Sequence, residues 1–354
     1  MRRCSERGSL LILALWSLSL FAVFAVSIGY SARARASLLA RLETADRLLT
    51  IGACGIERAR DAVLEDLTPD LDTLTDSWTG GTFFRSISAG DGFFTVFYEV
   101  PDPKGKTPAA VRYGALDAES RLNLNTADAG SIARLLQEVT TLGSDEAAEL
   151  AQCIVDWRDQ DSQFQHPNYG FEDSEYDDLS EPYACKDAPI GAPEELLLIK
   201  GMKRDIFNKM RPFVTFWGTG SVNLNTAPPE TLLALGLSRG AVAKVLAFRA
   251  GADGLAGTAD DEIFAQAGTI LSAMDRAVPP LDGAERSKME ELINAERLGA
   301  QSSVFQARSR GYLSVDDNGS PAGPFLEVEA AFERSGRVLY WRSSGVRWPS
   351  RASS

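Results

Sequence analysis

The stretch that decides the fold is Ser9–Tyr30, SLLILALWSLSLFAVFAVSIGY, a run of 22 residues without a charged side chain. At ~1.5 Å rise per residue, a helix of this length crosses ~30 Å of hydrocarbon and can span a membrane. A secretory signal peptide is the alternative, with a nominal cleavage site at residues 34–36. Because the apolar part of signal peptides runs only ~7 to 15 residues, the length favours a transmembrane helix.

The span is preceded by a short basic leader, MRRCSERG, which ends in Gly8. A leader peptidase could cut after Gly8 and leave Ser9 as the new N-terminus. Arginines flank the span in equal number on both sides, so the positive-inside rule does not settle its orientation.

Apolar residues continue beyond the span with the period of a helix. The stripe has a 4-3-4-3 spacing and comprises Leu38, Leu42, Ala45, Leu49, Gly52, Ile56, Ala59 and Val63. It ends at Thr68-Pro69, where proline lacks the amide hydrogen that a helix interior needs. We expect residues 31–67 to be an amphipathic continuation of the membrane helix.

The composition limits the classes of partner. The formal charge is −13 at pH 7, and it becomes −15 without residues 1–8, which carry three arginines and one glutamate. Such a chain repels phosphate backbones, which argues against general nucleic-acid binding. The four cysteines match no zinc spacing. Cys153 and Cys185 flank one acidic loop, and the sequence is equally compatible with a disulfide between them and with two unpaired buried thiols.

Aromatic and β-branched runs between turn residues predict antiparallel strands near both ends of the remaining chain. The runs are FFRSIS from Phe83, FFTVFYEV from Phe93, VRYGALDAES from Val111, SVFQARSRGYLSV from Ser303, FLEVEAAFERS from Phe325 and RVLYWRS from Arg337. Because a long helical segment separates the first three runs from the last three, we expect one sheet that is interrupted by an inserted domain.

The middle of the chain contains an internal repeat. LNLNTA at Leu122–Ala127 returns as VNLNTA at Val222–Ala227, and each copy precedes two helical patterns joined by Leu-Gly. We expect Thr126 and Thr226 to cap the first helix of each unit. A third hairpin, with Gly201 at its turn, lies between the two units.

These units resemble helix-hairpin-helix modules, which leaves a membrane-anchored DNA-binding receptor as the alternative function. In such modules the backbone N–H groups of the turn face a phosphate, and basic side chains stand nearby. The turn at Gly143–Glu146 is acidic, that at Gly236–Gly240 is nearly neutral, and only Lys200–Arg204 is basic. We expect the hairpins to be packing units, with no nucleic acid as a partner.

An acidic loop follows the first repeat unit. Residues 156–187 hold ten carboxylates and two basic residues. Carboxylates at this density repel one another unless a cation neutralises them, and such hard oxygen ligands suit Ca²⁺. The six aromatic residues in this loop argue against a disordered acidic tract. We therefore expect structural Ca²⁺ in this loop, whereas the second oxygen-rich loop, Gly251–Glu262, could be a flexible surface loop or a second Ca²⁺ site.

Catalytic motifs are missing from the sequence. His166 is the only histidine, and neither a Gly-x-Ser-x-Gly motif nor a phosphate-binding P-loop is present. We do not expect an enzyme.

The N-terminus resembles those of type IV pilins, which combine a basic leader, an apolar helix and its amphipathic continuation. Most of them carry a glutamate five residues into the mature chain, where Leu13 stands here. This departure, the NLNTA repeat, DWRDQD from Asp156 and ELLLIKG at Glu195–Gly201 resemble the minor pseudopilin K family of type II secretion systems. The resemblance covers nearly the whole chain.

The resemblance implies an α+β fold, in which a long N-terminal helix packs on an antiparallel β-sheet and a large all-α domain with helix-hairpin-helix-like repeats is inserted. The implied boundaries are 1–8 for the prepilin leader, 9–30 for the transmembrane helix, 31–67 for its continuation, 68–124 for the first part of the β lobe, 125–300 for the inserted domain, 301–345 for the C-terminal strands and 346–354 for the tail.

The resemblance also implies a function. Such a protein would lie at the tip of the pseudopilus and initiate or cap its assembly, for export of folded proteins across the outer membrane. Its partners would be other minor pseudopilins, the major pseudopilin, the inner-membrane assembly platform, the prepilin peptidase and the secreted substrate. It would cross the inner membrane once, with the bulk of the chain in the periplasm of a Gram-negative bacterium.

The resemblance finally assigns ligands for Ca²⁺ in the acidic loop. The first choices are Asp159, Asp161, Glu172 and Asp173, and the further candidates are Glu175, Asp177 and Asp178. Phe171 stands where the family usually has alanine, so the loop departs from the family's pattern within the site itself.

Overall fold

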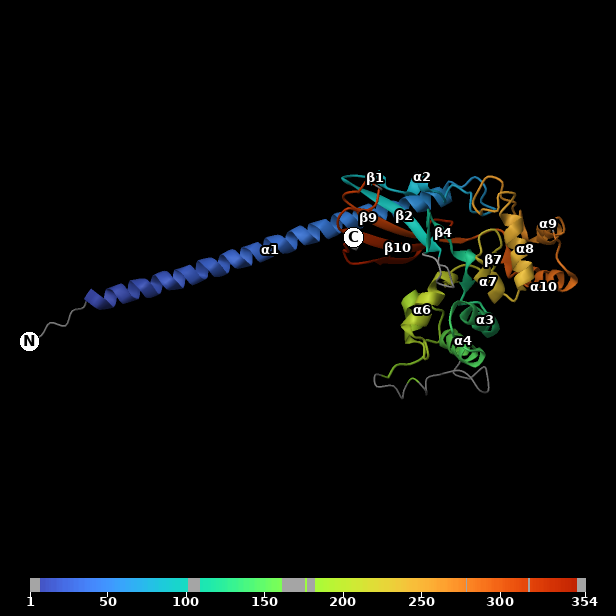
Figure 1. The fold of residues 1–354 in the computed structure, drawn as a ribbon. Helices are drawn as coiled ribbons and strands as arrows, with labels where there is room; N and C mark the ends of the chain where they lie inside the picture. Colours follow the sequence, from blue (N-terminus) through green and yellow to red (C-terminus); the bar gives the residue numbers. More distant parts are fainter. Residues whose placement is uncertain are drawn as a thin grey trace, which may run out of the picture.

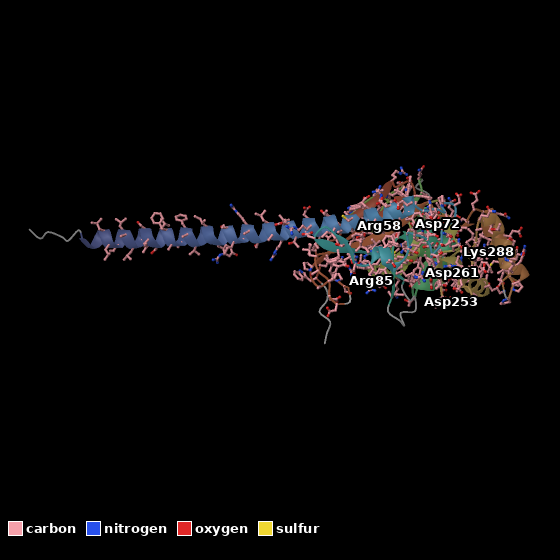
Figure 2. All side chains as sticks on the ribbon, turned by 90° about the horizontal axis from the view of Figure 1, so that it is seen from above. Arg58, Asp72, Arg85, Asp253, Asp261 and Lys288 are labelled. Carbon is pink, nitrogen blue, oxygen red and sulfur yellow. The ribbon has the colours of Figure 1, made fainter. Side chains whose placement is uncertain are left out.

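The computed structural model describes residues 7–100, 109–160, 176, 182–277, 279–317 and 319–348. One 58-residue helix, α1 (Arg7–Leu64), projects from a head that holds the rest of the described chain (Figure 1). Side chains from Leu10 to Glu43 are exposed all round this helix (Figure 2). Among the described residues, α1 is the helix long and apolar enough to cross a membrane.

The C-terminal part of α1 packs on the sheet. Its buried residues follow the helical period and comprise Leu48, Ile51, Gly52, Gly55, Ile56, Ala59, Ala62 and Val63. Leu38 and Leu42 of the expected stripe are exposed, because residues of α1 become partly buried only from Thr44 onward. The helix ends at Leu64, three residues earlier than expected, where the Asp66 carboxylate accepts the N–H of Thr68 at 3.0 Å.

The sheet has the order β1-β2-β9-β10-β11, with β3 paired to β2 and β4 to β9. The strands are β1 (Ile87–Ala89), β2 (Gly92–Val100), β3 (Ala110–Tyr113), β4 (Leu116–Asp117), β9 (Val304–Tyr312), β10 (Phe325–Glu333) and β11 (Val338–Ser343). All pairings are antiparallel, and β2 pairs with β9 across the insertion, with Phe93 opposite Tyr312. The expected interrupted sheet is therefore confirmed.

One expected strand is partly wrong. The run from Phe83 begins as a short helix, α2 (Gly81–Phe84), and becomes extended only at Ile87. The side chain of Phe84 is fully buried in the core between α1 and the sheet. The helical turn places this ring in the core, and the aromatic composition of the run did not indicate it.

The inserted domain has a hydrophobic core of its own, whose members run from Leu122 to Ala300. It lies on the side of the head away from the free end of α1 (Figure 1). The elements between β4 and β9 are η1 (Ala118–Ser120), β5 (Leu122–Asn123), α3 (Ala129–Val139), α4 (Ser144–Arg158), η2 (Pro193–Leu198), α6 (Arg204–Met210), η3 (Arg211–Phe213), β6 (Val214–Thr215), β7 (Val222–Asn223), α7 (Pro229–Ala234), α8 (Arg239–Arg249), η4 (Ala267–Thr269), α9 (Ile270–Met274), α10 (Gly283–Asn294) and β8 (Leu298–Gly299).

Candidate functional site

The two NLNTA repeats build the same local structure. In the first, β5 pairs in parallel with β6, and in the second, β7 pairs in parallel with β8. The first asparagine of each repeat turns the chain, because its side-chain oxygen accepts the N–H two residues on. The hydrogen bond from Asn125 N to Asn123 Oδ1 is 2.9 Å long, and that from Asn225 N to Asn223 Oδ1 is 3.0 Å long.

The second asparagine of each repeat holds the end of a distant loop. Asn125 accepts the N–H of Ile190 at 2.8 Å and donates to the Ile190 carbonyl at 2.9 Å. Asn225 likewise accepts the N–H of Phe264 at 2.8 Å and donates to the Phe264 carbonyl at 3.1 Å. Ile190 follows the acidic loop and Phe264 follows the loop Gly251–Glu262, so each repeat closes one oxygen-rich loop.

An arginine holds the start of each loop. Arg158, at the end of α4, donates to the carbonyl oxygens of Leu124 and Ala127, the latter at 2.5 Å. Arg249, at the end of α8, donates to the carbonyl of Ala227 at 2.7 Å. The aromatic-Arg ending of each second helix thus ties that helix back to the NLNTA segment.

The acidic loop is described only at its two ends and at Tyr176. Asp159 is the C-terminal cap residue of α4, and its N–H donates to the Val155 carbonyl at 3.1 Å. The remaining candidate ligands lie outside the described residues; they are Asp161, Glu172, Asp173, Glu175, Asp177 and Asp178.

An aromatic cluster fastens this loop to the domain. The Tyr176 ring is fully buried and makes an edge contact with Trp157, with ring centroids 5.5 Å apart. Its hydroxyl accepts the N–H of Lys200 at 3.2 Å, and burial raises the pKa of Tyr176. The ring centroids of Tyr183 and Tyr176 are 5.2 Å apart, and the Tyr183 hydroxyl donates to the Leu198 carbonyl at 2.6 Å. These rings therefore give the carboxylate-rich segment fixed points of attachment.

The loop Gly251–Glu262 is closed by its own carboxylates. Asp260 accepts the N–H groups of Ala252 and Asp253 at 2.8 and 3.0 Å, and Asp261 accepts that of Gly257 at 2.7 Å. Hydrogen bonds from the Thr258 hydroxyl and the backbone hold the pKa of Asp260 below its ordinary value. The carboxylates of Asp260 and Asp261 thus hold a set of turns at this surface.

The disulfide alternative is not realised in the structure. Cys153 is a free thiol within the domain core, and burial raises its pKa to about 12. The Cys185 thiol donates to the carbonyl of Asp156 at 3.6 Å. Cys153 and Cys185 are therefore two unpaired buried thiols, which was the second alternative left open by the sequence.

Comparison with known proteins gives a match to one family over part of the chain. Residues 115–219 match the family model described as Type II secretion system (T2SS), protein K. The type II secretion system protein K of Aeromonas hydrophila is 31% identical over 87 residues, which are 24% of this chain and 26% of that protein. This part of the chain is therefore similar to protein K of type II secretion systems. The match to the curated protein K spans only about a quarter of that relative's length.

A solved protein K assembly has the same fold. The crystal structure of the GspK-GspI-GspJ complex from enterotoxigenic Escherichia coli matches with a TM-score of 0.60 and 17% identity, covering 90% of this chain and 99% of that chain. The expected α+β fold is confirmed, and α1 is long and apolar enough for a single-pass membrane anchor. These comparisons give the DNA-receptor alternative no support.

A buried polar junction, which sequence reasoning missed, joins the inserted domain to the sheet lobe. Asn223 Nδ2 donates to the Asp72 carbonyl at 3.1 Å, to Asp117 Oδ2 at 2.9 Å and to Ser302 Oγ at 3.1 Å. The Asp72 carboxylate accepts the N–H of Ser302 at 2.7 Å and pairs with Arg334. Burial raises the pKa of Asp72 to about 7 and that of Asp117 to about 6.

The Asp72 carboxylate also lies near Asp66 and Asp76, with one oxygen of each within 4.8 Å of the others. Arg334 pairs with Asp66 at 3.2 Å as well, so its guanidinium already supplies positive charge to this cluster. The only sequence signal for the junction is Asn223, which belongs to the repeat. Its partners come from segments far apart in the chain that share no pattern.

Proposed function

We propose that this protein is a minor pseudopilin at the tip of the type II secretion pseudopilus, where it initiates or caps assembly for export of folded proteins across the outer membrane. The observation that carries the proposal is the position of the inserted domain in a chain similar to protein K. The domain lies on the side of the head away from the free end of α1 (Figure 1). In a filament whose α1 helices pack in parallel, it would occupy the place of the next subunit, so this chain would end the filament.

The residue at Leu13 supports the same position. Its side chain is exposed in the apolar part of α1. In pilin-class filaments the glutamate at this position is thought to neutralise the N-terminus of the subunit ahead, and a tip subunit has none ahead of it. A leucine there leaves no buried charge without a partner, which would be costly in an apolar environment.

The proposed location and processing follow from this role. The chain would cross the inner membrane once through α1, with the head in the periplasm of a Gram-negative bacterium. The prepilin peptidase would cut between Gly8 and Ser9. The partners would be two further minor pseudopilins, equivalent to GspI and GspJ of the solved complex, together with the major pseudopilin, the assembly platform and the secreted substrate.

Co-purification tests the proposal. The full chain would be co-expressed with the candidate minor pseudopilins of its own organism, extracted in detergent and separated by size exclusion. We expect a stoichiometric complex, and immunogold labelling of sheared pseudopili at one end only. Labelling along the whole fibre would contradict the tip position, and retention of labelled duplex DNA without complex formation would favour the receptor alternative.

We further propose that the acidic loop holds structural Ca²⁺ through Asp159, Asp161, Glu172 and Asp173, with Glu175, Asp177 and Asp178 as further ligands. The donor set fits in chemistry, because all seven are carboxylates and Ca²⁺ prefers oxygen ligands. Arg158 and Asn125 support the proposal, since they fix the two ends of the loop. The bound ion would neutralise the repulsion between these side chains.

A further inference from the structure

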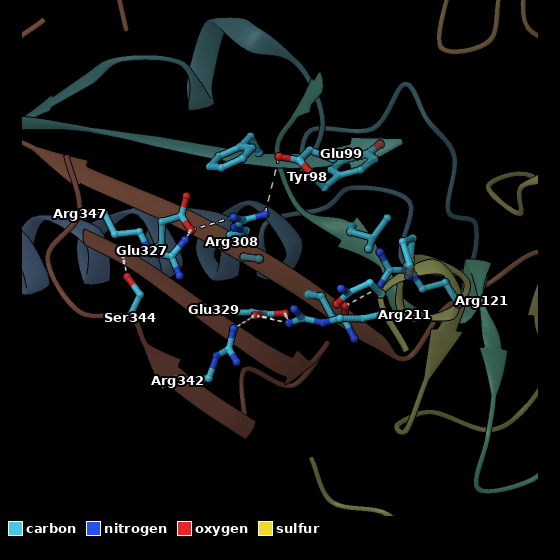
Figure 3. Close-up of a pocket in the computed structure, with 16 residues that line it drawn as sticks. Tyr98, Glu99, Arg121, Arg211, Arg308, Glu327, Glu329, Arg342, Ser344 and Arg347 are labelled. Atoms are coloured by element: carbon cyan, nitrogen blue, oxygen red, sulfur yellow. Dashed lines mark hydrogen bonds and ion pairs between the residues drawn. The ribbon is translucent and has the colours of Figure 1, made fainter. Parts of the chain in front are cut away.

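The outer face of the sheet, opposite α1, forms a groove with α6 and η3 (Figure 3). Its volume is about 340 Å³, within the range of sites that bind small ligands or peptide side chains. Five arginines and three glutamates line it. Its net charge is therefore +2, in a chain whose net charge is −13.

The glutamates of the groove are already shared between arginines. Glu327 pairs with Arg308 at 2.7 Å and with Arg310 at 2.6 Å. Glu329 pairs with Arg211 at 2.8 Å and with Arg342 at 3.3 Å. Glu327 and Glu329 thus each face more than one cation, and the third glutamate, Glu99, lies 3.9 Å from Arg308. Because five arginines face three glutamates, positive charge remains available for a further anion.

Arg121 is the cation with the least compensation. Its guanidinium donates to the neutral amide oxygen of Gln306 at 2.8 Å. Its buried Nε has no hydrogen-bond partner among the residues that the structure describes, and no carboxylate lies within ion-pair distance of it in that part of the chain. Burial lowers the pKa of Arg121 to about 10, although the negative charge of Glu329 acts in the opposite direction. A carboxylate beside this guanidinium would offset the cost of burying its charge.

We propose that this groove binds an acidic, extended segment of a partner protein, with one carboxylate at Arg121 and others at the rim near Arg342 and Arg347. Guanidinium groups bind carboxylates in a planar, bidentate geometry. In this groove the guanidinium groups are spread out rather than gathered at one point (Figure 3). A phosphate group would meet stronger repulsion from Glu327 and Glu329, because it carries about −1.5 to −2 charges at pH 7.

Fluorescence anisotropy tests this site with the full chain in detergent micelles and a fluorescein-labelled hexaglutamate peptide at low salt. We expect saturable binding that Arg121→Gln weakens about tenfold and that Arg347→Gln, at an exposed rim position, weakens about threefold. Arg239→Gln is the matched control. That arginine is exposed on α8 and pairs with Glu138 outside the groove, so its removal should leave the affinity unchanged.

Three results would overturn the proposal. These are the absence of binding, equal binding of a hexalysine peptide, and displacement of the peptide by inorganic phosphate at the same concentration of charge. Thermal melts accompany each variant. Should Arg121→Gln fail to fold, Arg342→Gln and Arg347→Gln decide, and wild-type affinity in both would reject the groove as the site.

Discussion

The side-chain amides of Asn125 and Asn225 each make two hydrogen bonds to the backbone of one distant residue. Each amide accepts the N–H of that residue and donates to its C=O, as a neighbouring strand would. Replacing either by alanine removes these bonds and leaves buried backbone groups without partners. We expect Asn125→Ala and Asn225→Ala each to lower the free energy of unfolding by about 2 to 3 kcal/mol. Urea unfolding in detergent micelles measures the change.

The matched control for these variants is Asn294→Ala, at the exposed end of α10. A surface substitution of this kind should change the free energy of unfolding by less than about 0.5 kcal/mol. Equal effects of all three substitutions would mean that the repeat asparagines do not hold the loops.

Asp117 makes stability depend on pH. Burial raises its folded-state pKa from 3.8 to about 6, so the folded protein holds this proton more tightly than the unfolded chain. Its contribution is therefore fully present below about pH 4 and is lost as the pH rises through 6. The free-energy difference between wild type and Asp117→Asn should fall by about 3 kcal/mol between pH 4 and pH 7.

Urea unfolding of both proteins across this pH range measures the difference. Asp91→Asn serves as the control, because Asp91 is exposed and pairs only at the surface with Arg47. A difference between wild type and Asp117→Asn that does not vary with pH would show that Asp117 keeps an ordinary pKa in the folded protein.

At the scale of elements, α1 lies on the sheet at glycines. A Cβ added to Gly311 in β9 would stand 2.4 Å from the Leu48 carbonyl oxygen and 2.6 Å from Gly52 N. These are backbone atoms, which cannot rotate away. We expect Gly311→Val to separate helix and strand and to cost about 3 kcal/mol or more of stability. A melt of the variant checks this, with Gly283→Ala as the control, since nothing lies within 4 Å of that added Cβ.

Periodicity predicted the elements well where one face of each is buried. The interrupted sheet, the paired helices after each repeat and the helical stripe from Gly52 onward follow from it. Local caps were less predictable. Asp128, not Thr126, caps α3 by accepting the N–H of Ser131 at 2.7 Å, and the Thr126 hydroxyl donates to the Asn123 carbonyl at 3.4 Å.

The second repeat shows the same limit. Pro228 takes the cap position of α7, and Thr226 donates to Asp117 at 2.5 Å across the junction. Both segments offer more than one residue able to cap, so tertiary contacts decide which is used. The groove at Arg121 was unpredictable for a related reason, because its lining comes from β2, β9, β10, β11, α6 and η3, whose relative placement no local pattern encodes.

At the scale of the whole molecule, two separate hydrophobic cores predict two unfolding steps. One core belongs to α1 and the sheet, and the other spans Leu122 to Ala300. If the acidic loop holds Ca²⁺ as proposed, chelation should destabilise only the inserted domain. The loss would be about 2.7 kcal/mol when free Ca²⁺ had been at one hundred times its dissociation constant.

Calorimetric titration of Ca²⁺ followed by melts with and without chelator measures this effect. We expect one of the two transitions to move to lower temperature and the other to stay in place. Asp159→Asn should reproduce the shift without chelator, whereas Asp145→Asn, in the first turn of α4, serves as the charge-matched control. Two unchanged transitions would rule out a structural ion.

The continuity of α1 has a mechanical consequence. The helix runs without a break from its apolar end into the core of the head, and at 58 residues it is ~87 Å long. Because Leu48 and Gly52 of this helix lie close against Gly311 of the sheet, a tilt of the helix would carry the head with it. A tilt of only ~5° at the membrane would swing the far end of such a helix by ~7 Å. Small changes in the tilt of α1 among packed membrane helices would therefore displace the head by about the width of a side chain.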